Sequence, residues 1–213
     1  MKENYKIDTK WIIRAGLGLA ILLIIISIFI DKHQDSFEQQ IQQYREQKDA
    51  FFKESEKSPI EDKEHFTGLN YFDPERKYRV KATLQPIHEQ SNIIVKRNDG
   101  REDVYRKFAK ASFELEGEKY QLTLLINQLE SDSQLVAFIP FYDKTNGDET
   151  YQGGRYLDVK IQKDDEAIID FNFAYNPFCV YSYKFSCPLP PEENFINLHI
   201  RAGEKIWKNH DEE

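Results

Sequence analysis

Two polar stretches in the carboxy-terminal half hold the residues best suited to chemistry. The candidate ligand-binding side chains are Asp143, Glu149 and Arg155 in DKTNGDETYQGGRY, and Asp170, Asn172 and Asn176 in IDFNFAYNP. Residues two apart on a strand share one face, about 7 Å apart, so a strand here would present Asp170 and Asn172 together. The structural alternative to a small-ligand pocket is a buried ion pair between Arg155 and Asp170 that fixes the sheet register.

The same carboxylates suggest a hydrolase as a second possibility. Asp143 or Glu149 paired with Asp170 would supply the two acidic groups of a glycosidase, but nothing in the sequence fixes their separation. There is no Gly-x-Ser-x-Gly elbow, and Ser182 with Lys184 is a spacing that arises often by chance. No catalytic residue is assigned, and a protein that is not an enzyme is favoured.

Cysteine and histidine bear on redox and metal chemistry. Cys179 and Cys187 are the two cysteines of the chain, and in an oxidising compartment such a closely spaced pair can form a disulfide. The alternative is two small buried side chains. No histidine stands at a ligand spacing from another histidine or from a cysteine, so we expect neither a metal nor a cofactor. The histidines are His33, His65, His88, His199 and His210.

Alternation of apolar and polar residues predicts a β-rich domain over residues 58–205. Expected strands run over Tyr78 to Leu84, Ile93 to Lys96, Val104 to Phe108, Ala111 to Leu115, Tyr120 to Ile126, Leu135 to Tyr142, Tyr156 to Ile161, Ala167 to Phe173 and Ile196 to Arg201. Asn98-Asp99-Gly100 and Gly117 predict two hairpin turns, and Asn146-Gly147 resembles a third. Because no helical pattern separates the strands, we expect an antiparallel barrel or sandwich of about eight or nine strands.

A membrane anchor is predicted at residues 11–30, WIIRAGLGLAILLIIISIFI, where Arg14 is the one charge. A helix of about 20 apolar residues spans about 30 Å of hydrocarbon. The run ends without small residues at a cleavage site, so we expect it to be retained. Lys2, Lys6 and Lys10 precede it, which places residues 1–10 in the cytoplasm and the body outside, periplasmic or extracellular. The alternative is a buried helix of a soluble protein.

A second helix is predicted between this anchor and the body, over residues 31–57. Phe37, Ile41, Tyr44 and Phe51 recur at spacings of four, three and seven, which indicates an amphipathic helix. Lys48 interrupts the apolar stripe, which favours a helix packed on its own body over a coiled-coil dimer. At the other end, residues 206–213 are expected to form a solvated tail.

Three stretches of the chain have a more specific character. YDKTNGDETYQGGRYLDV, IDFNFAYNPFCVYSYKFSCPLPPEEN and IRAGEK, with SPIEDKEHFTGLNYF upstream, resemble the uncharacterised bacterial family catalogued as domain of unknown function 1684. The resemblance runs from about residue 40 to residue 205. It implies a single β-rich module and brings no assigned activity.

Charge and location together limit the partners. The formal charge is -8, which offers no basic surface for a nucleic acid. Residues 31–213 hold 25 of the 29 Lys and Arg and 35 of the 37 Asp and Glu, a net charge of -10, so the body should not lie flat on anionic lipid. We therefore expect a single-pass protein of the cytoplasmic membrane whose body is a binding or structural module of the cell envelope. An envelope protein or a small ligand is the expected partner, and the alternative is a hydrolase acting on an envelope substrate.

Overall fold

The computed structural model describes residues 36–87, 91–127, 135–162 and 165–207, together with Leu19, Leu22 and Leu23, which are helical. The chain divides into two compact units, residues 1–45 and 46–213. Apart from these three leucines, the predicted anchor at 11–30 lies outside the described residues, as do the predicted cytoplasmic tail at 1–10 and residues 208–213 of the predicted terminal tail. Within the described part of the chain, no helix is both long and apolar enough to cross a membrane.

The predicted amphipathic helix is present over residues 36–54. Phe37 and Ile41 are buried as expected, but on the last turns Phe52 is buried and Phe51 is 37% exposed. The buried stripe therefore continues through Phe52, three helical turns after Ile41. Within the larger unit, the Phe52 ring lies 4.9 Å from that of Tyr181, so the end of this helix packs on the body.

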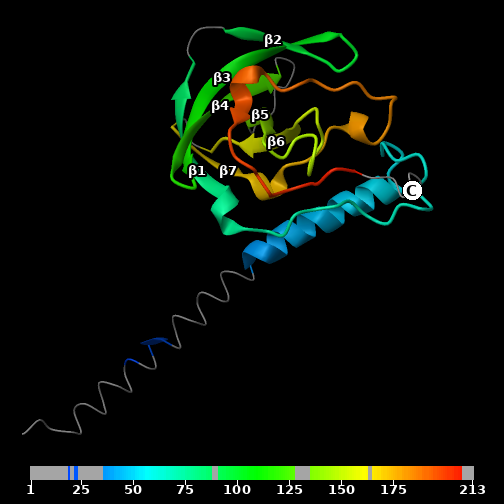
Figure 1. Cartoon of the computed structure of the whole chain (residues 1–213), viewed down its shortest axis with the longest axis horizontal. Helices are drawn as coiled ribbons and strands as arrows, with labels where there is room; N and C mark the ends of the chain where they lie inside the picture. Colours follow the sequence, from blue (N-terminus) through cyan, green and yellow to red (C-terminus); the bar gives the residue numbers. More distant parts are fainter. Residues whose placement is uncertain are drawn as a thin grey trace, which may run out of the picture. The chain divides into compact units, whose positions relative to one another are not determined.

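The body is one antiparallel sheet that curls into a nearly closed barrel, which confirms the predicted β class (Figure 1). Its strands are β1 (Arg79–Pro86), β2 (Asn92–Lys96), β3 (Glu102–Leu115), β4 (Glu118–Asn127), β5 (Val136–Asp143), β6 (Arg155–Lys160), β7 (Glu166–Asp170) and β8 (Phe195–Ile196). The hydrogen-bonded order is β6-β5-β4-β3-β1-β7, while β2 pairs with β3 and the short β8 runs parallel to β5. The curl brings β7, one end of this order, beside β6, the other end.

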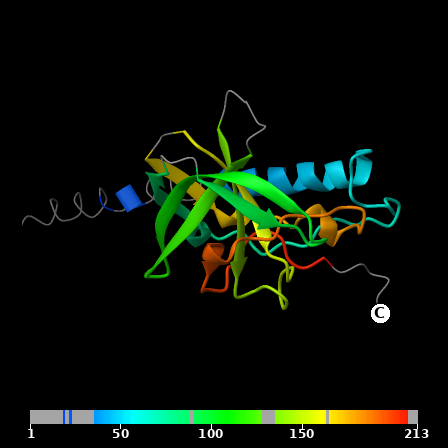
Figure 2. The same ribbon diagram turned by 90° about the horizontal axis from the view of Figure 1, so that it is seen from above.

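Strand β3 joins two segments that were predicted as separate strands, Val104 to Phe108 and Ala111 to Leu115. Its register against β4 shifts between Lys107 and Ala109, and such a bulge lets one long strand bend instead of ending. Figure 2 shows the resulting twist of the long green strands. Both predicted hairpins are confirmed, and Gly100 and Gly117 adopt the positive φ angles, 86° and 82°, that their turns require.

Two predicted strands are shorter than expected. Beyond Asp170 the chain enters the 3-10 turn η2 (Phe171–Phe173), because the Asp170 carboxylate accepts the backbone N–H of Asn172 at 3.1 Å and stabilises the turn. The expected strand from Ile196 to Arg201 is reduced to β8. Beyond it, the N–H of Ile200 donates to a carboxylate oxygen of Asp143 instead of to a neighbouring strand.

The barrel interior is filled by inward-facing apolar side chains. Leu122, Leu124, Ile139, Phe141 and Ile169 are all fully buried there. A second, smaller cluster joins Phe52, Ile60 and Phe66 with the half-buried Tyr181 and Trp207.

Candidate functional site

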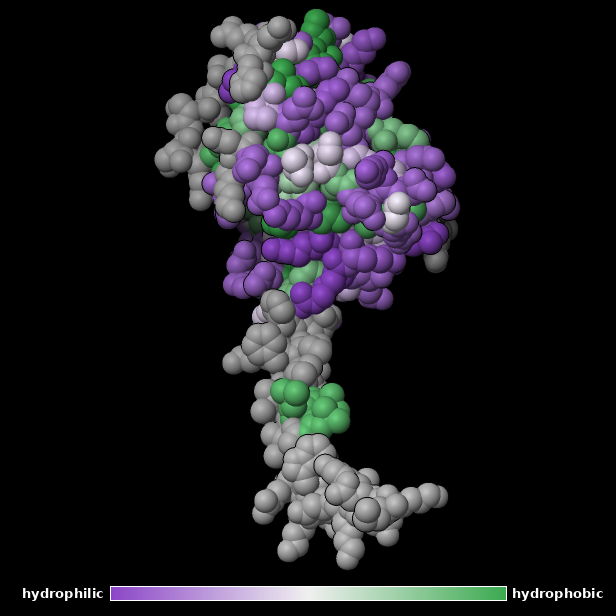
Figure 3. All heavy atoms as spheres, turned by 90° about the vertical axis from the view of Figure 1, so that its left-hand side faces the viewer, coloured by the Kyte–Doolittle hydropathy of each residue, from purple (hydrophilic) through white to green (hydrophobic). Residues whose placement is uncertain are grey.

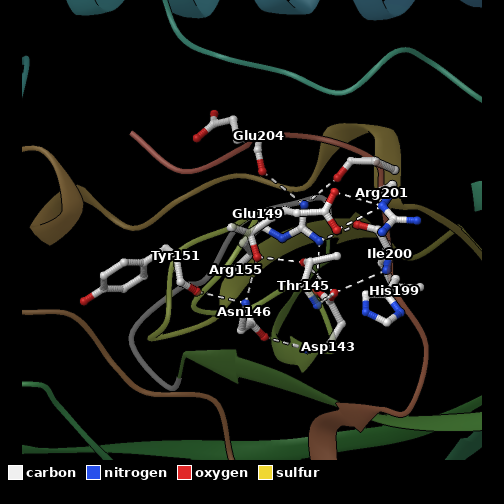
Figure 4. Close-up of polar contacts among 12 residues, drawn as sticks. Asp143, Thr145, Asn146, Glu149, Tyr151, Arg155, His199, Ile200, Arg201 and Glu204 are labelled. Carbon is white, nitrogen blue, oxygen red and sulfur yellow. Dashed lines mark hydrogen bonds and ion pairs between the residues drawn. The ribbon is translucent and has the colours of Figure 1, made fainter. Parts of the chain in front are cut away.

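Arg155, at the start of β6, is the largest fully buried side chain among the described residues. It meets Asp143, the last residue of β5, and neither side chain has any exposed surface. Nη2 donates to Asp143 Oδ2 and to the carbonyl of Ile200, both at 2.8 Å. Nη1 donates to the carbonyls of Ala202 and Glu204 (Figure 4). One guanidinium therefore holds the carboxy-terminal segment against the end of the sheet.

The second oxygen of Asp143 is also fully occupied. Oδ1 accepts the Thr145 N–H at 2.8 Å, the Thr145 hydroxyl at 2.6 Å and the Ile200 N–H at 3.2 Å. A carboxylate with this many donors and no exposed surface has no oxygen open to a substrate. Asp143 is thus placed as a structural group.

Gly154, directly before Arg155, lets the chain enter β6 at this point. It has a φ of 86°, and a Cβ there would lie 2.5 Å from the Pro190 ring and 2.7 Å from the Phe141 carbonyl. The site therefore needs a glycine for both conformation and space. This requirement explains the second glycine of the Gly153-Gly154 pair in the sequence.

The β5–β6 connection is an ordered loop and not a two-residue hairpin turn at Asn146-Gly147. The Asn146 side chain accepts the Asp143 N–H at 2.7 Å and donates to the Tyr151 carbonyl at 2.9 Å. Glu149 lies on the outside of this loop, where both carboxylate oxygens accept from Arg201 Nε at 2.8 and 2.9 Å. The hydrogen bond from Arg201, and then its charge, lowers the pKa of Glu149.

A second buried carboxylate, Glu204, gathers Asn176 and two residues that were not predicted as site residues, Lys48 and Tyr181. Glu204 Oε1 pairs with Lys48 Nζ, and Oε2 accepts the Tyr181 hydroxyl at 2.6 Å and the Asn176 N–H at 2.8 Å. Burial, followed by the Glu204 charge, raises the pKa of Tyr181 well above its ordinary value. The signal for Lys48 was its interruption of the apolar stripe, and its side chain is 12% exposed.

Asp170 and Asn172 form a third group with partners on β1 and before it. Asp170 pairs with Arg79 Nη1 at 3.0 Å and accepts the Asn172 amide at 2.7 Å. Asn172 also accepts the Glu75 N–H and donates to its carbonyl. The predicted ion pair between Arg155 and Asp170 is wrong, because β7 pairs with β1 and places Asp170 opposite Arg79.

The six predicted residues therefore lie in separate groups. Asp143 and Arg155 share one, Asp170 and Asn172 another, Asn176 belongs with Glu204, and Glu149 with Arg201. Their joint binding of a ligand stays a prediction that this placement does not favour. Among the residues that the structure describes, no three His, Cys, Asp or Glu side chains are grouped as metal ligands would be.

Cys179 and Cys187 lie next to each other as free thiols. The N–H of Cys179 donates to Cys187 Sγ at 3.2 Å. Hydrogen bonding from the Cys179 thiol, with Arg97 nearby, lowers the pKa of Cys187 to about 7, while the same contact raises that of Cys179. The pair is positioned for thiol chemistry, and the disulfide stays a prediction.

Two grooves of similar size are among the hollows on the described surface of the body. The first, of about 500 Å³, lies where β6 and β7 meet, and we call it the seam groove; it is lined by Arg79, Lys81, Asp158, Val159, Lys160, Gln162, Glu166, Ala167, Ile168, Asp170 and Phe173. The second, of about 510 Å³, lies beside Phe66, Tyr181 and Trp207. Figure 3 shows a mostly hydrophilic face of the body with small apolar patches between the charged groups.

Comparisons with known proteins agree with this architecture. The solution NMR structure of an uncharacterised protein from gene locus rrnAC0354 of Haloarcula marismortui is similar, with a TM-score of 0.65 and 41% sequence identity over 82% of this chain and 97% of that one. No curated protein matches the sequence. The family described as "Protein of unknown function (DUF1684)" matches residues 64–205. A bacterial origin of the chain stays a prediction. The match over residues 64–205 shows that the chain belongs to this family.

Proposed function

We propose that the protein is a single-pass membrane-anchored binding module whose body works outside the cytoplasm, on a component of the cell envelope. The apolar run at residues 11–30 and the cations before it support the anchor and its orientation. The seam groove, with a volume in the range typical of ligand sites, supports a binding role for the body.

The observation that carries the choice between binding and hydrolysis is the fate of the candidate carboxylates. Asp143, Glu149 and Asp170 are each paired with a different arginine, at 2.8, 2.8 and 3.0 Å. A glycosidase needs two carboxyl groups facing one substrate at a defined separation. Carboxylates that each serve a separate arginine favour a module that binds over one that hydrolyses.

The location is tested with two fusions of the full chain after Glu213. Alkaline phosphatase is active only outside the cytoplasm. Green fluorescent protein fluoresces only when it stays in the cytoplasm, and it is dark when it is exported by the same route. We expect an active phosphatase and a dark fluorescent protein, both recovered in the membrane fraction with an intact amino terminus. The opposite pair of results, or a chain that starts after Ile30, would contradict the proposal.

A further inference from the structure

The two strands at the ends of the sheet are neighbours in the chain that do not pair. Only residues 161–165 connect β6 to β7 along the chain. In the strand order, five antiparallel pairings lead from β6 through β5, β4, β3 and β1 to β7, so β6 and β7 run in opposite directions. Strands joined by so short a connection usually form a hairpin ladder. Here β6 is paired with β5 and β7 with β1, and among the described residues no ladder joins the two. Each therefore presents an edge to the seam groove.

The hydrogen bonds of neighbouring residues show which backbone groups face that groove. Tyr156 exchanges both of its backbone hydrogen bonds with Tyr175, at 2.9 and 3.0 Å, on the side away from β5. Because the direction of the backbone N–H and carbonyl alternates along a strand, these groups of Lys160 point to the same side as those of Tyr156. On β7, the Asp165 carbonyl accepts from Leu84 of β1 at 2.8 Å, so the backbone of Ile168, three residues on, faces the seam.

The floor and walls of the groove differ in character. Val159 and Ala167, at 4% and 5% exposure, form an apolar floor with the ring of Phe173. On the walls, Lys81 pairs with Glu166, and Arg79 with Asp170. Such a groove suits a chain that alternates apolar and polar side chains, which is the pattern of a β-strand.

Lys160 adds a preference of charge. It is exposed on the β6 wall and forms no ion pair within the described residues. Its ammonium, which has no carboxylate partner among the described residues, favours an acidic side chain on the bound chain. The exposed Ile168, at 46%, offers an apolar contact on the opposite wall.

We propose that the seam groove binds an extended, acidic segment of a partner protein by strand addition to the open edge of β7. In this mode, main-chain hydrogen bonds supply affinity and side-chain pockets supply specificity. A segment of about five residues matches the length of β7, at about 3.3 Å per residue. The inference deepens the proposed function and rests on it, since it names the partner class of the groove.

The test uses the full chain in detergent micelles and a displayed library of nonapeptides in which Val, Ile or Leu alternates with Thr, Glu or Lys. We expect enrichment of sequences that contain Glu, and a synthetic copy of the best one is the probe for fluorescence polarisation. Lys160→Glu should weaken this probe about tenfold, while Lys160→Met should weaken it about threefold.

The decisive variants are Ile168→Pro and its matched control Ile168→Ala. Proline removes the N–H that faces the groove and no ladder bond to β1, which an edge position tolerates. We expect at least tenfold weaker binding for Ile168→Pro and less than threefold for Ile168→Ala. N-methylation of alternate amides in the probe tests the same main-chain hydrogen bonds without altering the protein. It should abolish binding.

Several results would overturn the inference. These are no enrichment over empty micelles, equal binding by Ile168→Pro and Ile168→Ala, full binding of the N-methylated probe, or self-association of the chain that Ile168→Pro abolishes, which would make a second copy the occupant. Failure here is distinguishable from failure of the proposed function. The fusions report location whether or not a peptide binds, and a peptide can bind a chain whose body lies inside.

Discussion

Two arginine–aspartate pairs show how differently the buried network and the seam groove use the same chemistry. Arg155 and Asp143 meet at 2.8 Å with no exposed surface, and Arg155 also holds three backbone carbonyls. Arg79 and Asp170 meet at 3.0 Å, but the Arg79 side chain is 44% exposed beside open space. The first pair leaves no surface open to a ligand. The second leaves surface for a partner, so residue type alone does not distinguish a structural from a binding position.

Replacing Arg155 should give the largest effect. Arg155→Met leaves the Asp143 carboxylate buried without its counter-charge, which typically costs about 3–5 kcal/mol. At about 2–4 °C per kcal/mol for a chain of this size, the melting temperature should fall by roughly 10 °C. Thermal melts by circular dichroism of the full chain in detergent measure this change.

The matched control is the double variant Asp143→Leu with Arg155→Met. For an isolated ion pair, replacing both partners by apolar groups is often neutral. Here the carbonyls of Ile200, Ala202 and Glu204 would still lose their donors, so the double variant should remain destabilised. A melting temperature equal to that of wild type for either variant would contradict the structural role of this pair.

Lys48→Met should have the next largest effect. It removes the cation from the buried Glu204 carboxylate, which keeps the Tyr181 hydroxyl and the Asn176 N–H as donors. Because these donors remain, we expect a loss of about 2–3 kcal/mol in the free energy of unfolding, in the range for a buried charged group that loses one partner. Urea unfolding measures it. Lys53→Met, at an exposed position of the same helix, is the control and should change little.

The sequence predicted the parts of the fold that depend on local signals. Alternation and the turns at Gly100 and Gly117 identified the strands and two hairpins, because both signals lie within a few residues. The sequence did not predict that Asp170 faces Arg79, 91 residues away. That pairing depends on β7 joining β1 instead of its chain neighbour β6, a choice of strand order that no local pattern encodes.

The site was predicted less well than the fold, for a related reason. The sequence drew attention to polar residues near strand ends, but their partners came from distant segments: Glu204 for Asn176, and Arg201 for Glu149. The bend at Phe171 to Phe173 also removed the shared strand face expected for Asp170 and Asn172. They nevertheless meet, because the Asp170 carboxylate caps the turn that contains Asn172.

The thiol pair should give an intermediate effect that depends on pH. In reduced protein, the pKa of Cys187 lies at about 7, below its ordinary value of 9.0, because the Cys179 thiol donates to it. A group whose pKa is lower in the folded state stabilises the fold above its unfolded pKa, and this contribution is lost as the pH falls through the folded pKa. The pKa itself is measured by the ultraviolet absorbance of the Cys187 thiolate, which should titrate with a midpoint of about 7.

Cys179→Ala is the matched variant for this titration. It removes the thiol donor, so the midpoint of Cys187 should rise towards its ordinary value. A midpoint that does not move would show that Cys179 is not the cause. Chain isolated from its native compartment without reductant should show no such titration if the predicted disulfide has formed, and two alkylated cysteines there would contradict the disulfide.

Arg79→Ala and Asp170→Asn should give the smallest effects, and they complete the comparison of the two pairs. An ion pair with one partner nearly half exposed is worth about 0–1 kcal/mol, so the melting temperature should fall by no more than about 4 °C. Asp170→Asn keeps an oxygen that accepts the Asn172 N–H, so the turn that follows β7 should persist. If either variant lowers the melting temperature as far as Arg155→Met does, the groove wall contributes to folding as much as the interior does, and the distinction between the two regions fails. If both stay near wild type, the surface that borders the seam groove is available for binding without cost to the barrel.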